Sequence, residues 1–370
     1  MIFRKKQGTV MTVVLAGVTL LLSMTACSMQ ENAENTETVV SENMLAETVT
    51  TESQVTENQN ETEAYRNETI TEEPALQETE DMAGQEQDSK ELQVTNPEST
   101  TLNNSTVSIS GQLIEYGDLQ QITLNPDWEY ADHSKINSGA AVLYLASEES
   151  GRKNIIIGVN AGHGTAGGSK VKTLCHPDGS AKTTGGSTSA GAAEATAVSG
   201  GMTFRDGTPE STVTLKMAQI LRDKLLANGY DVLMLRDGED VQLDNVARTV
   251  ICNNVADCHI ALHWDSGDGK DYDKGCFYIS VPEALKSMEP VASHWQQHDA
   301  LGADLVEGLR SQGTTIYGKG HMSIDLTQTS YSTIPSVDME LGNSYSDHSD
   351  ATLDTLAEGL VQGIQTYFGK

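Results

Sequence analysis

Hydrophobic and polar positions follow two distinct periods in the second half of the chain. Residues 154–160 (NIIIGVN) form a continuous apolar run, which is typical of a parallel strand buried on both faces. Residues 209–228 instead have apolar side chains at helical spacing and end at Asn228-Gly229, a usual helix stop. The same patterns predict strands at 230–235, 258–263, 275–281 and 336–341, and helices at 241–255, 291–312 and 351–368. Strands separated by helices predict an α/β domain of three layers, with a mostly parallel sheet flanked by helices.

The segments that precede this domain differ from it in composition. Residues 106–150 contain short strand-like runs but too few apolar positions for a core of their own, so we expect an N-terminal extension that packs on residues 151–370. Residues 27–105 are polar and acidic, with 19 acidic and 2 basic side chains in 28–100. Low hydrophobicity and high charge predict a disordered linker there.

The first residues resemble an export signal. Arg4, Lys5 and Lys6 precede an apolar stretch too short for a comfortable membrane span, which predicts a signal peptide over residues 1–26. The sequence that ends at Cys27 resembles a bacterial lipobox, which implies lipidation of Cys27 and tethering to the membrane surface. An ordinary signal peptide with an incidental Cys27 is the alternative.

Net charge limits the choice of partners. The chain of 370 residues carries 53 acidic and 23 basic side chains, a formal net charge of -30. Nucleic-acid binding relies on clustered Lys and Arg, so we expect no nucleic-acid partner. Protein partners are not indicated by any motif.

Four polar residues are expected at one edge of the sheet. His163 follows the first strand, and His263 and Glu340 lie near the ends of two later strands. Glu210 opens the helix after the first strand, where Thr208 can cap it and Pro209 suits its first position. Carboxyl ends of parallel strands gather at one edge, so these side chains should converge there.

Two histidines and a carboxylate are the usual ligands of a catalytic zinc ion, and a further carboxylate can act as general base. These residue types would serve a zinc peptidase equally well.

The segment from Asn154 to the C-terminus resembles the zinc-dependent N-acetylmuramoyl-L-alanine amidases of bacterial cell walls. The similarity lies in IIIGVNAGHG, PESTVTLKMAQILRDKLLANGYDVLMLRD, LDNVARTVICNNVADCHIALHWDS and IPSVDMELGN, in the family's order and spacing. It implies one Zn²⁺ held by His163, Glu210 and His263, with Glu340 as the catalytic residue. It also implies peptidoglycan as the substrate, and a role for Arg248 in anchoring a helix near the site.

The sequence departs from the family pattern between His163 and Glu210. The intervening residues exceed what the pattern needs, and we expect 165–207 to be an insertion on the catalytic rim. Shaping of substrate access and a disordered, functionless insertion are equally open. Asp265 and Ser266 also replace the family's Asn after the second histidine, which bears on substrate fit.

Other candidate residues carry weaker signals. His176 could substitute as a ligand, and His294 and His298 have a metal-compatible spacing, although a solvated helix face explains that pair better. Asp338 could hydrogen-bond a ligand histidine. We predict no disulfide.

The resulting hypothesis is a lipid-anchored amidase that acts outside the cytoplasm on the bond between N-acetylmuramic acid and L-alanine. The alternatives are a zinc peptidase or carboxypeptidase of wall peptides, and a non-catalytic lipoprotein that binds peptidoglycan.

Overall fold

The computed structural model describes residues 106–107, 114–115, 119–266 and 271–369. The chain divides into two units, 1–90 and 91–370, and everything described belongs to the second. The predicted signal peptide, Cys27 and the acidic linker lie outside the described residues, so these remain predictions.

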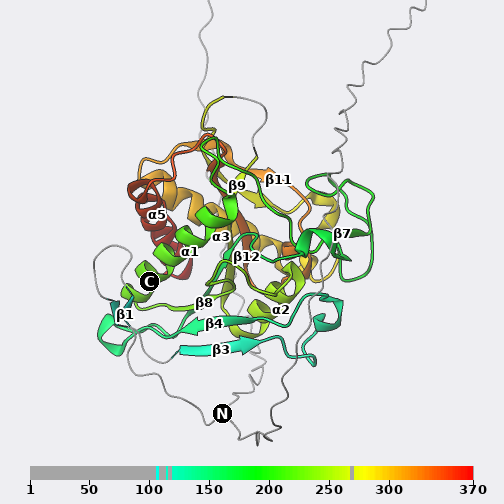
Figure 1. Cartoon of the computed structure of the whole chain (residues 1–370), viewed down its shortest axis with the longest axis horizontal. Helices are drawn as coiled ribbons and strands as arrows, with labels where there is room; N and C mark the ends of the chain where they lie inside the picture. The colour runs from blue at the N-terminus through cyan, green and yellow to red at the C-terminus, as the bar shows by residue number, and fades with distance from the viewer. Residues whose placement is uncertain (1–105, 108–113, 116–118, 267–270, 370) are drawn as a thin grey trace, which may run out of the picture. The chain divides into compact units, whose positions relative to one another are not determined.

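An eight-stranded sheet forms the centre of the fold, in the order β11-β10-β12-β9-β5-β8-β4-β3 (Figure 1). Its four middle strands run parallel, which confirms the predicted α/β class with a mostly parallel sheet. They are β12 (Ser336–Asn343), β9 (Cys258–Asp265), β5 (Ile156–Ala161) and β8 (Asp231–Met234). Their side chains are largely buried, as continuous apolar runs require when both faces of a sheet are covered.

Antiparallel pairings extend the sheet on both sides. β4 (Ala140–Tyr144) pairs with β8, and β3 (Leu119–Thr123) pairs with β4, so the segment before residue 151 contributes two strands to the same sheet. On the other side β10 (Cys276–Ser280) runs antiparallel to β12, and β11 (Ile316–Ser323) runs parallel to β10. The boundary at residue 151 remains a prediction.

Helices cover the two faces of the sheet (Figure 1). One face packs against α1 (Glu210–Ala227), α3 (Val291–Ser311) and α5 (Asp350–Phe368), whose buried side chains share one core with the strands. The other face packs against α2 (Asn245–Val255), and α4 (Thr327–Tyr331) lies beside α2. α2 begins at Asn245 instead of residue 241 because the Asp244 side chain accepts a hydrogen bond from the Ala247 N–H and caps the helix.

Helices α3 and α5 meet through glycines. A Cβ on Gly308 would lie 2.1 Å from the carbonyl oxygen of Gly359, and one on Gly363 would lie 2.5 Å from Cα of Leu305. The two backbones therefore approach more closely than any larger side chain would allow.

The insertion at 165–207 is folded and contains β6 (Lys172–Leu174) and β7 (Glu194–Thr196), an antiparallel pair. β1 (Thr106–Val107) and β2 (Ile114–Glu115) form another small antiparallel pair. Short 3-10 helices are η1 (Ala131–His133), η2 (Glu148–Ser150), η3 (Gly168–Lys170) and η4 (Glu283–Leu285). No helix within the described part of the chain is long and apolar enough to cross a bilayer.

Candidate active site

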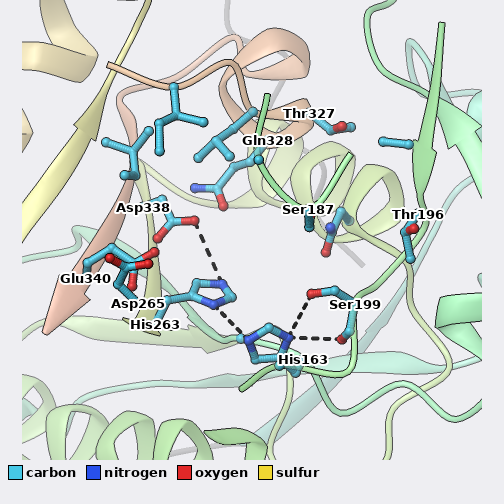
Figure 2. Close-up of a pocket in the computed structure, with 18 of the residues that line it drawn as sticks. His163, Ser187, Thr196, Ser199, His263, Asp265, Thr327, Gln328, Asp338 and Glu340 are labelled. Atoms are coloured by element: carbon cyan, nitrogen blue, oxygen red, sulfur yellow. Dashed lines mark hydrogen bonds and ion pairs between the residues drawn. The ribbon is translucent and has the colours of Figure 1, made fainter. Parts of the chain in front are cut away.

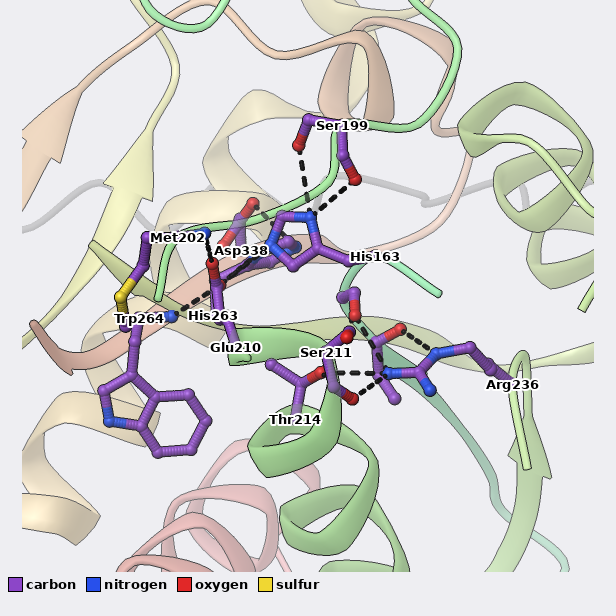
Figure 3. A network of polar contacts seen from close by, with 12 residues as sticks. His163, Ser199, Met202, Glu210, Ser211, Thr214, Arg236, His263, Trp264 and Asp338 are labelled. Carbon is purple, nitrogen blue, oxygen red and sulfur yellow. Dashed lines mark hydrogen bonds and ion pairs between the residues drawn. The ribbon is translucent and has the colours of Figure 1, made fainter. Parts of the chain in front are cut away.

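The four predicted residues lie together at the carboxyl edge of the parallel strands (Figures 2 and 3). His163 follows β5, and His263 and Glu340 are register partners on β9 and β12. Glu210 is the first residue of α1, preceded by Pro209; the helix has no side-chain cap, so the expected role of Thr208 is not seen. The topology thus supplies one polar group from each of four separate segments at this edge.

Three donor atoms face one point between these segments. His163 Nε2 lies 2.9 Å from Glu210 Oε1 and 3.1 Å from His263 Nδ1, and His263 Nδ1 lies 3.2 Å from Glu210 Oε1. Among the residues that the structure describes, this is the one group of three or more His, Cys, Asp or Glu side chains able to hold a metal ion together.

Glu210 is buried, and both of its carboxylate oxygens accept hydrogen bonds. Its Oε2 accepts a hydrogen bond from the Met202 N–H at 2.8 Å, and its Oε1 accepts one from the Trp264 N–H at 3.0 Å (Figure 3). Burial alone raises the pKa of this carboxyl, but its close contacts with the imidazole rings of His163 and His263 more than offset burial and leave the pKa well below its ordinary value. Glu210 is therefore a fixed carboxylate.

The backbone around His163 sets the direction of its ring. His163 adopts a left-handed conformation with φ of 67°, and its Nδ1 lies 2.9 Å from the carbonyl oxygen of Ser199. A carbonyl only accepts, so Nδ1 donates and the Nε2 lone pair is left facing Glu210 and His263. A Cβ on Gly201 would lie 2.8 Å from the His163 ring, so a larger residue does not fit there.

His263 lies between Glu210 and Asp338. Its Nε2 is 3.8 Å from Asp338 Oδ2, an ion-pair distance that is too long for a hydrogen bond (Figure 2). Burial lowers the pKa of His263, but the carboxylates of Asp338 and Glu210 outweigh burial and raise it to about 10. The acidic surroundings therefore favour positive charge at this point.

Glu340 is the carboxyl group left without a partner. Its Oε2 is buried and accepts no hydrogen bond from the described residues. Burial, together with the neighbouring Asp338 carboxylate, raises the pKa of Glu340 well above its ordinary value. A carboxyl group with a raised pKa can both take up and return a proton near neutral pH.

Two buried arginines hold the backbone behind the histidines. Arg248 donates to the carbonyl oxygen of His163 at 2.8 Å and to that of Ala161 at 3.1 Å. Arg236 donates to the carbonyl oxygen of Gly162 at 3.0 Å and to Thr214 Oγ1 at 2.9 Å (Figure 3). Sequence reasoning had singled out Arg248 but missed Arg236, although it lies within a stretch that carries the family similarity.

A cavity of about 560 Å³ opens over the four site residues. The insertion supplies one part of its wall, and the chain between β11 and α4 supplies another (Figure 2). The lining includes Lys182, Ser187, Thr188, Thr196 and Ser199 from the insertion, and Ile324, Leu326, Thr327 and Gln328. Sequence analysis identified none of these, since only the tertiary fold brings them to the site.

Other candidate residues lie away from this centre. His176 is buried against Asp325, with Nε2 at 3.0 Å from Oδ1, and its Nδ1 contacts Ser180 Oγ at 2.8 Å. His298 is buried in α3 instead of lying on a solvated face, and its Nδ1 accepts the Ser336 N–H at 3.0 Å. The four cysteines in the described segments are free and buried: Cys175, Cys252, Cys258 and Cys276.

Comparison with known proteins identifies the family to which the chain belongs. The family model described as N-acetylmuramoyl-L-alanine amidase matches residues 157–366. No curated protein matches the chain. Similar solved structures include the amidase Ami1 of Mycobacterium abscessus (20% identity, 58% of this chain, 99% of that chain, TM-score 0.47) and Ami1 of Mycobacterium smegmatis (17% identity, 58% and 97%, TM-score 0.49). Another is AmiC2 of Nostoc punctiforme (16% identity, 59% and 99%, TM-score 0.43).

Proposed function

Since the chain belongs to the family of N-acetylmuramoyl-L-alanine amidases, which hydrolyse the amide bond between N-acetylmuramic acid and L-alanine in peptidoglycan, we propose that it does so with zinc. The family supports this activity over the wall peptidase and the binding lipoprotein that the residue types alone left open. The observation that carries the zinc assignment is the convergence of His163, Glu210 and His263 beside Glu340.

The three side chains fit a zinc ion. Bonds of about 2.0–2.2 Å to one tetrahedral ion place ligand atoms roughly 3.3 Å apart, close to the separations between the three donor atoms. Two neutral imidazole nitrogens 3.1 Å apart repel each other unless a proton or a cation lies between them. A set of two histidines and one carboxylate leaves a further position open, as in catalytic zinc sites.

A zinc ion held there would supply Lewis-acid chemistry, lowering the pKa of water and polarising the substrate carbonyl. Glu340 is then the group that moves the proton. It takes a proton from the water that adds to the lactyl carbonyl carbon, and it returns that proton to the alanine nitrogen as the C–N bond breaks. The products are a free lactyl carboxyl group on the glycan and a free amine on the stem peptide.

The remaining residues hold this arrangement. Asp338 faces Nε2 of His263, which supports a tautomer that keeps Nδ1 free of a proton. Arg248 and Arg236 fix the carbonyl groups on either side of His163. We assign them positioning roles, because their guanidinium groups are turned to the protein backbone.

We also propose that the enzyme is anchored to the membrane. Peptidoglycan lies outside the cytoplasm, which agrees with an export signal at 1–26. Lipidation of Cys27 would fix the chain to the membrane surface, and residues 27–105 would then span the distance to the wall.

The proposed function is tested with the purified protein, defined muropeptides and mass spectrometry. We expect an intact stem peptide and a free glycan, with about one zinc per chain. Glu340→Gln keeps the shape of the side chain but removes the base, so we expect kcat to fall by about 100- to 10,000-fold with zinc retained.

Zinc content below one in ten chains for a folded wild-type protein would contradict the metal assignment. Full activity of Glu340→Gln would contradict the assignment of the base. Asn343→Asp, near the same strand end but without a base role, tests whether any change in β12 has the same effect.

A further inference from the structure

Lys182 places a buried ammonium group in the wall of the substrate cavity. The residue is only 7% exposed, and it lines the same cavity as His163, His263 and Glu340. It belongs to the insertion, the part of the chain that the family pattern does not require. Lys182 is therefore not part of the family pattern, and its ammonium group has no role in the amide hydrolysis described above.

The described residues use only part of the hydrogen-bonding capacity of Lys182. Its Nζ donates to the backbone carbonyl oxygen of Asp325, and no ion pair within the described ranges includes it. The Asp325 carboxylate is engaged elsewhere, by His176 Nε2 at 3.0 Å and by the Thr183 N–H at 2.7 Å. An ammonium group has three N–H donors, so hydrogen-bonding capacity remains. Burial raises the pKa of the Asp325 carboxyl, but its bonds to His176 and Thr183 and the nearby charge of Lys182 lower it overall, so Asp325 balances part of the Lys182 charge. Among the described residues Lys182 forms no ion pair, and its ammonium group remains available to pair with a ligand carboxylate.

Acidic side chains and Lys182 line different regions of the cavity. The carboxyl groups of Asp265, Asp338 and Glu340 line the cavity beside His263 (Figure 2). The neighbours that the insertion contributes with Lys182 are neutral hydrogen-bonding residues, among them Ser187, Thr188 and Thr196. Asp265 is paired with Lys274, so the repulsion comes from Asp338 and Glu340, and an anionic group of a ligand is better placed beside Lys182.

We propose that Lys182 binds a carboxylate of the stem peptide. This inference rests on the proposed function, because it takes peptidoglycan as the ligand. The glycan side of the scissile amide presents hydroxyl and N-acetyl groups, whereas the peptide side carries free carboxyl groups. A cation in the wall can therefore distinguish the peptide from the glycan, and a carboxylate from its carboxamide.

The test compares muropeptides whose stem-peptide carboxyl groups are free with the same muropeptides converted to carboxamides. For Lys182→Met, whose unbranched side chain is one atom shorter and uncharged, we expect kcat/KM to fall about 10- to 100-fold on the free-acid substrate. On the carboxamide substrate we expect wild type and Lys182→Met to be equal. Lys182→Arg should retain the preference for the free acid.

Lys170→Met is the matched control. Lys170 is exposed on the same insertion, so its loss should leave kcat/KM on both substrates unchanged. Lys182→Met should fold normally because Asp325 keeps its bonds to His176 and Thr183, which a thermal melt checks. An equal loss on both substrates, or no loss on either, would overturn the proposal.

A binding measurement separates this inference from the proposed function. The released stem peptide, with carboxyl groups free or amidated, is titrated into wild type and Lys182→Met by calorimetry, which requires no hydrolysis. We expect wild type to bind the free-acid peptide about 10- to 100-fold more tightly than the amidated one, and the variant to lose that difference. Equal binding of the two peptides by wild type would refute the Lys182 subsite even if the protein is an amidase.

Discussion

Single residues decide whether the side chains of the proposed metal site can meet. Gly162 lies directly under the His263 ring: a Cβ there would lie 2.3 Å from Cε1 of His263. The side chain of His263 is held by Glu210 on one side and faces Asp338 on the other, so it has little room to move. The position of the His263 ring therefore requires a glycine at residue 162.

We expect Gly162→Ala to lower kcat/KM at least about 100-fold, because the added methyl group displaces a ligand. Zinc content should fall in parallel, as measured by metal analysis, while the circular dichroism spectrum stays unchanged. Gly238→Ala is the control, since a Cβ there has no neighbour closer than 3.9 Å. Full zinc occupancy in Gly162→Ala would argue against His263 as a ligand.

At the residue scale, the sequence predicted those site residues whose position follows from a topological rule. His163, His263 and Glu340 follow or end strands, and carboxyl ends of parallel strands share an edge, so their meeting could be inferred. Lys182, Ser199 and Arg236 could not be inferred in this way. Their roles depend on which carbonyl groups and cavity walls they reach after folding, and local sequence does not encode those distances.

At the scale of elements, the glycine contact between α3 and α5 fixes the separation of two helices. In α5 the buried face includes Gly359 and Gly363, and Leu305 and Gly308 of α3 lie against it. Glycine normally weakens a helix, so its presence here reflects close packing and not helix propensity.

Gly363→Ala should destabilise the protein by about 1–3 kcal/mol, because overpacking outweighs the gain in helix propensity. Chemical denaturation followed by circular dichroism measures this free energy of unfolding. Thr355→Ala, on an exposed position of α5, should change it by less than about 0.5 kcal/mol. A stabilised Gly363→Ala protein would show that the helices can move apart freely.

Periodicity predicted the elements that are rich in apolar positions and missed those that have few of them. The four parallel strands and α1, α2, α3 and α5 carry enough apolar positions for their period to be recognised. β11 is half exposed and contains Gly318 and Gly320, so it has no clear alternation. α4 and the paired strands of the insertion are too short for any period, and they are held by tertiary contacts.

At the scale of the whole molecule, buried histidines link stability to pH. His259 is buried, and neither ring nitrogen has a hydrogen-bond partner among the described residues. Burial lowers the pKa of His259 to about 3, and burial together with His294 lowers that of His298 to about 3. Unfolding exposes both rings, which then titrate near pH 6.5.

Between pH 6.5 and 3 the unfolded chain therefore binds more protons than the folded chain. We expect full stability from these groups above pH 6.5, and a loss of up to about 1.4 kcal/mol per histidine for each pH unit below it. Denaturation at pH 7, 6 and 5 measures the slope, and His259→Phe should remove the part that His259 contributes. The raised pKa of Glu340 contributes a slope of opposite sign, so the test is the difference between the two proteins: an unchanged slope in His259→Phe would mean that this ring stays solvated in the folded state.

The proposed anchoring at the membrane concerns the whole molecule and can be tested directly. If Cys27 is lipidated, the N-terminal peptide of the mature protein should begin at Cys27 and carry the mass of a lipid. Cys27→Ser should move the protein from the membrane fraction to the soluble fraction without changing its activity on muropeptides. An unmodified N-terminus other than Cys27 would indicate an ordinary signal peptide.

The two ends of the insertion are fixed by the reaction centre itself. The chain leaves the domain just after His163, and it returns at Met202, whose N–H binds Glu210. Ser199 and Gly201 also lie in this segment and hold the His163 ring, so only its outer part, which carries Lys182, Ser187 and Thr188, is free of contacts with the centre. If Lys182 binds the stem peptide, substrate recognition can diversify in that outer part while the hydrolytic centre remains constant.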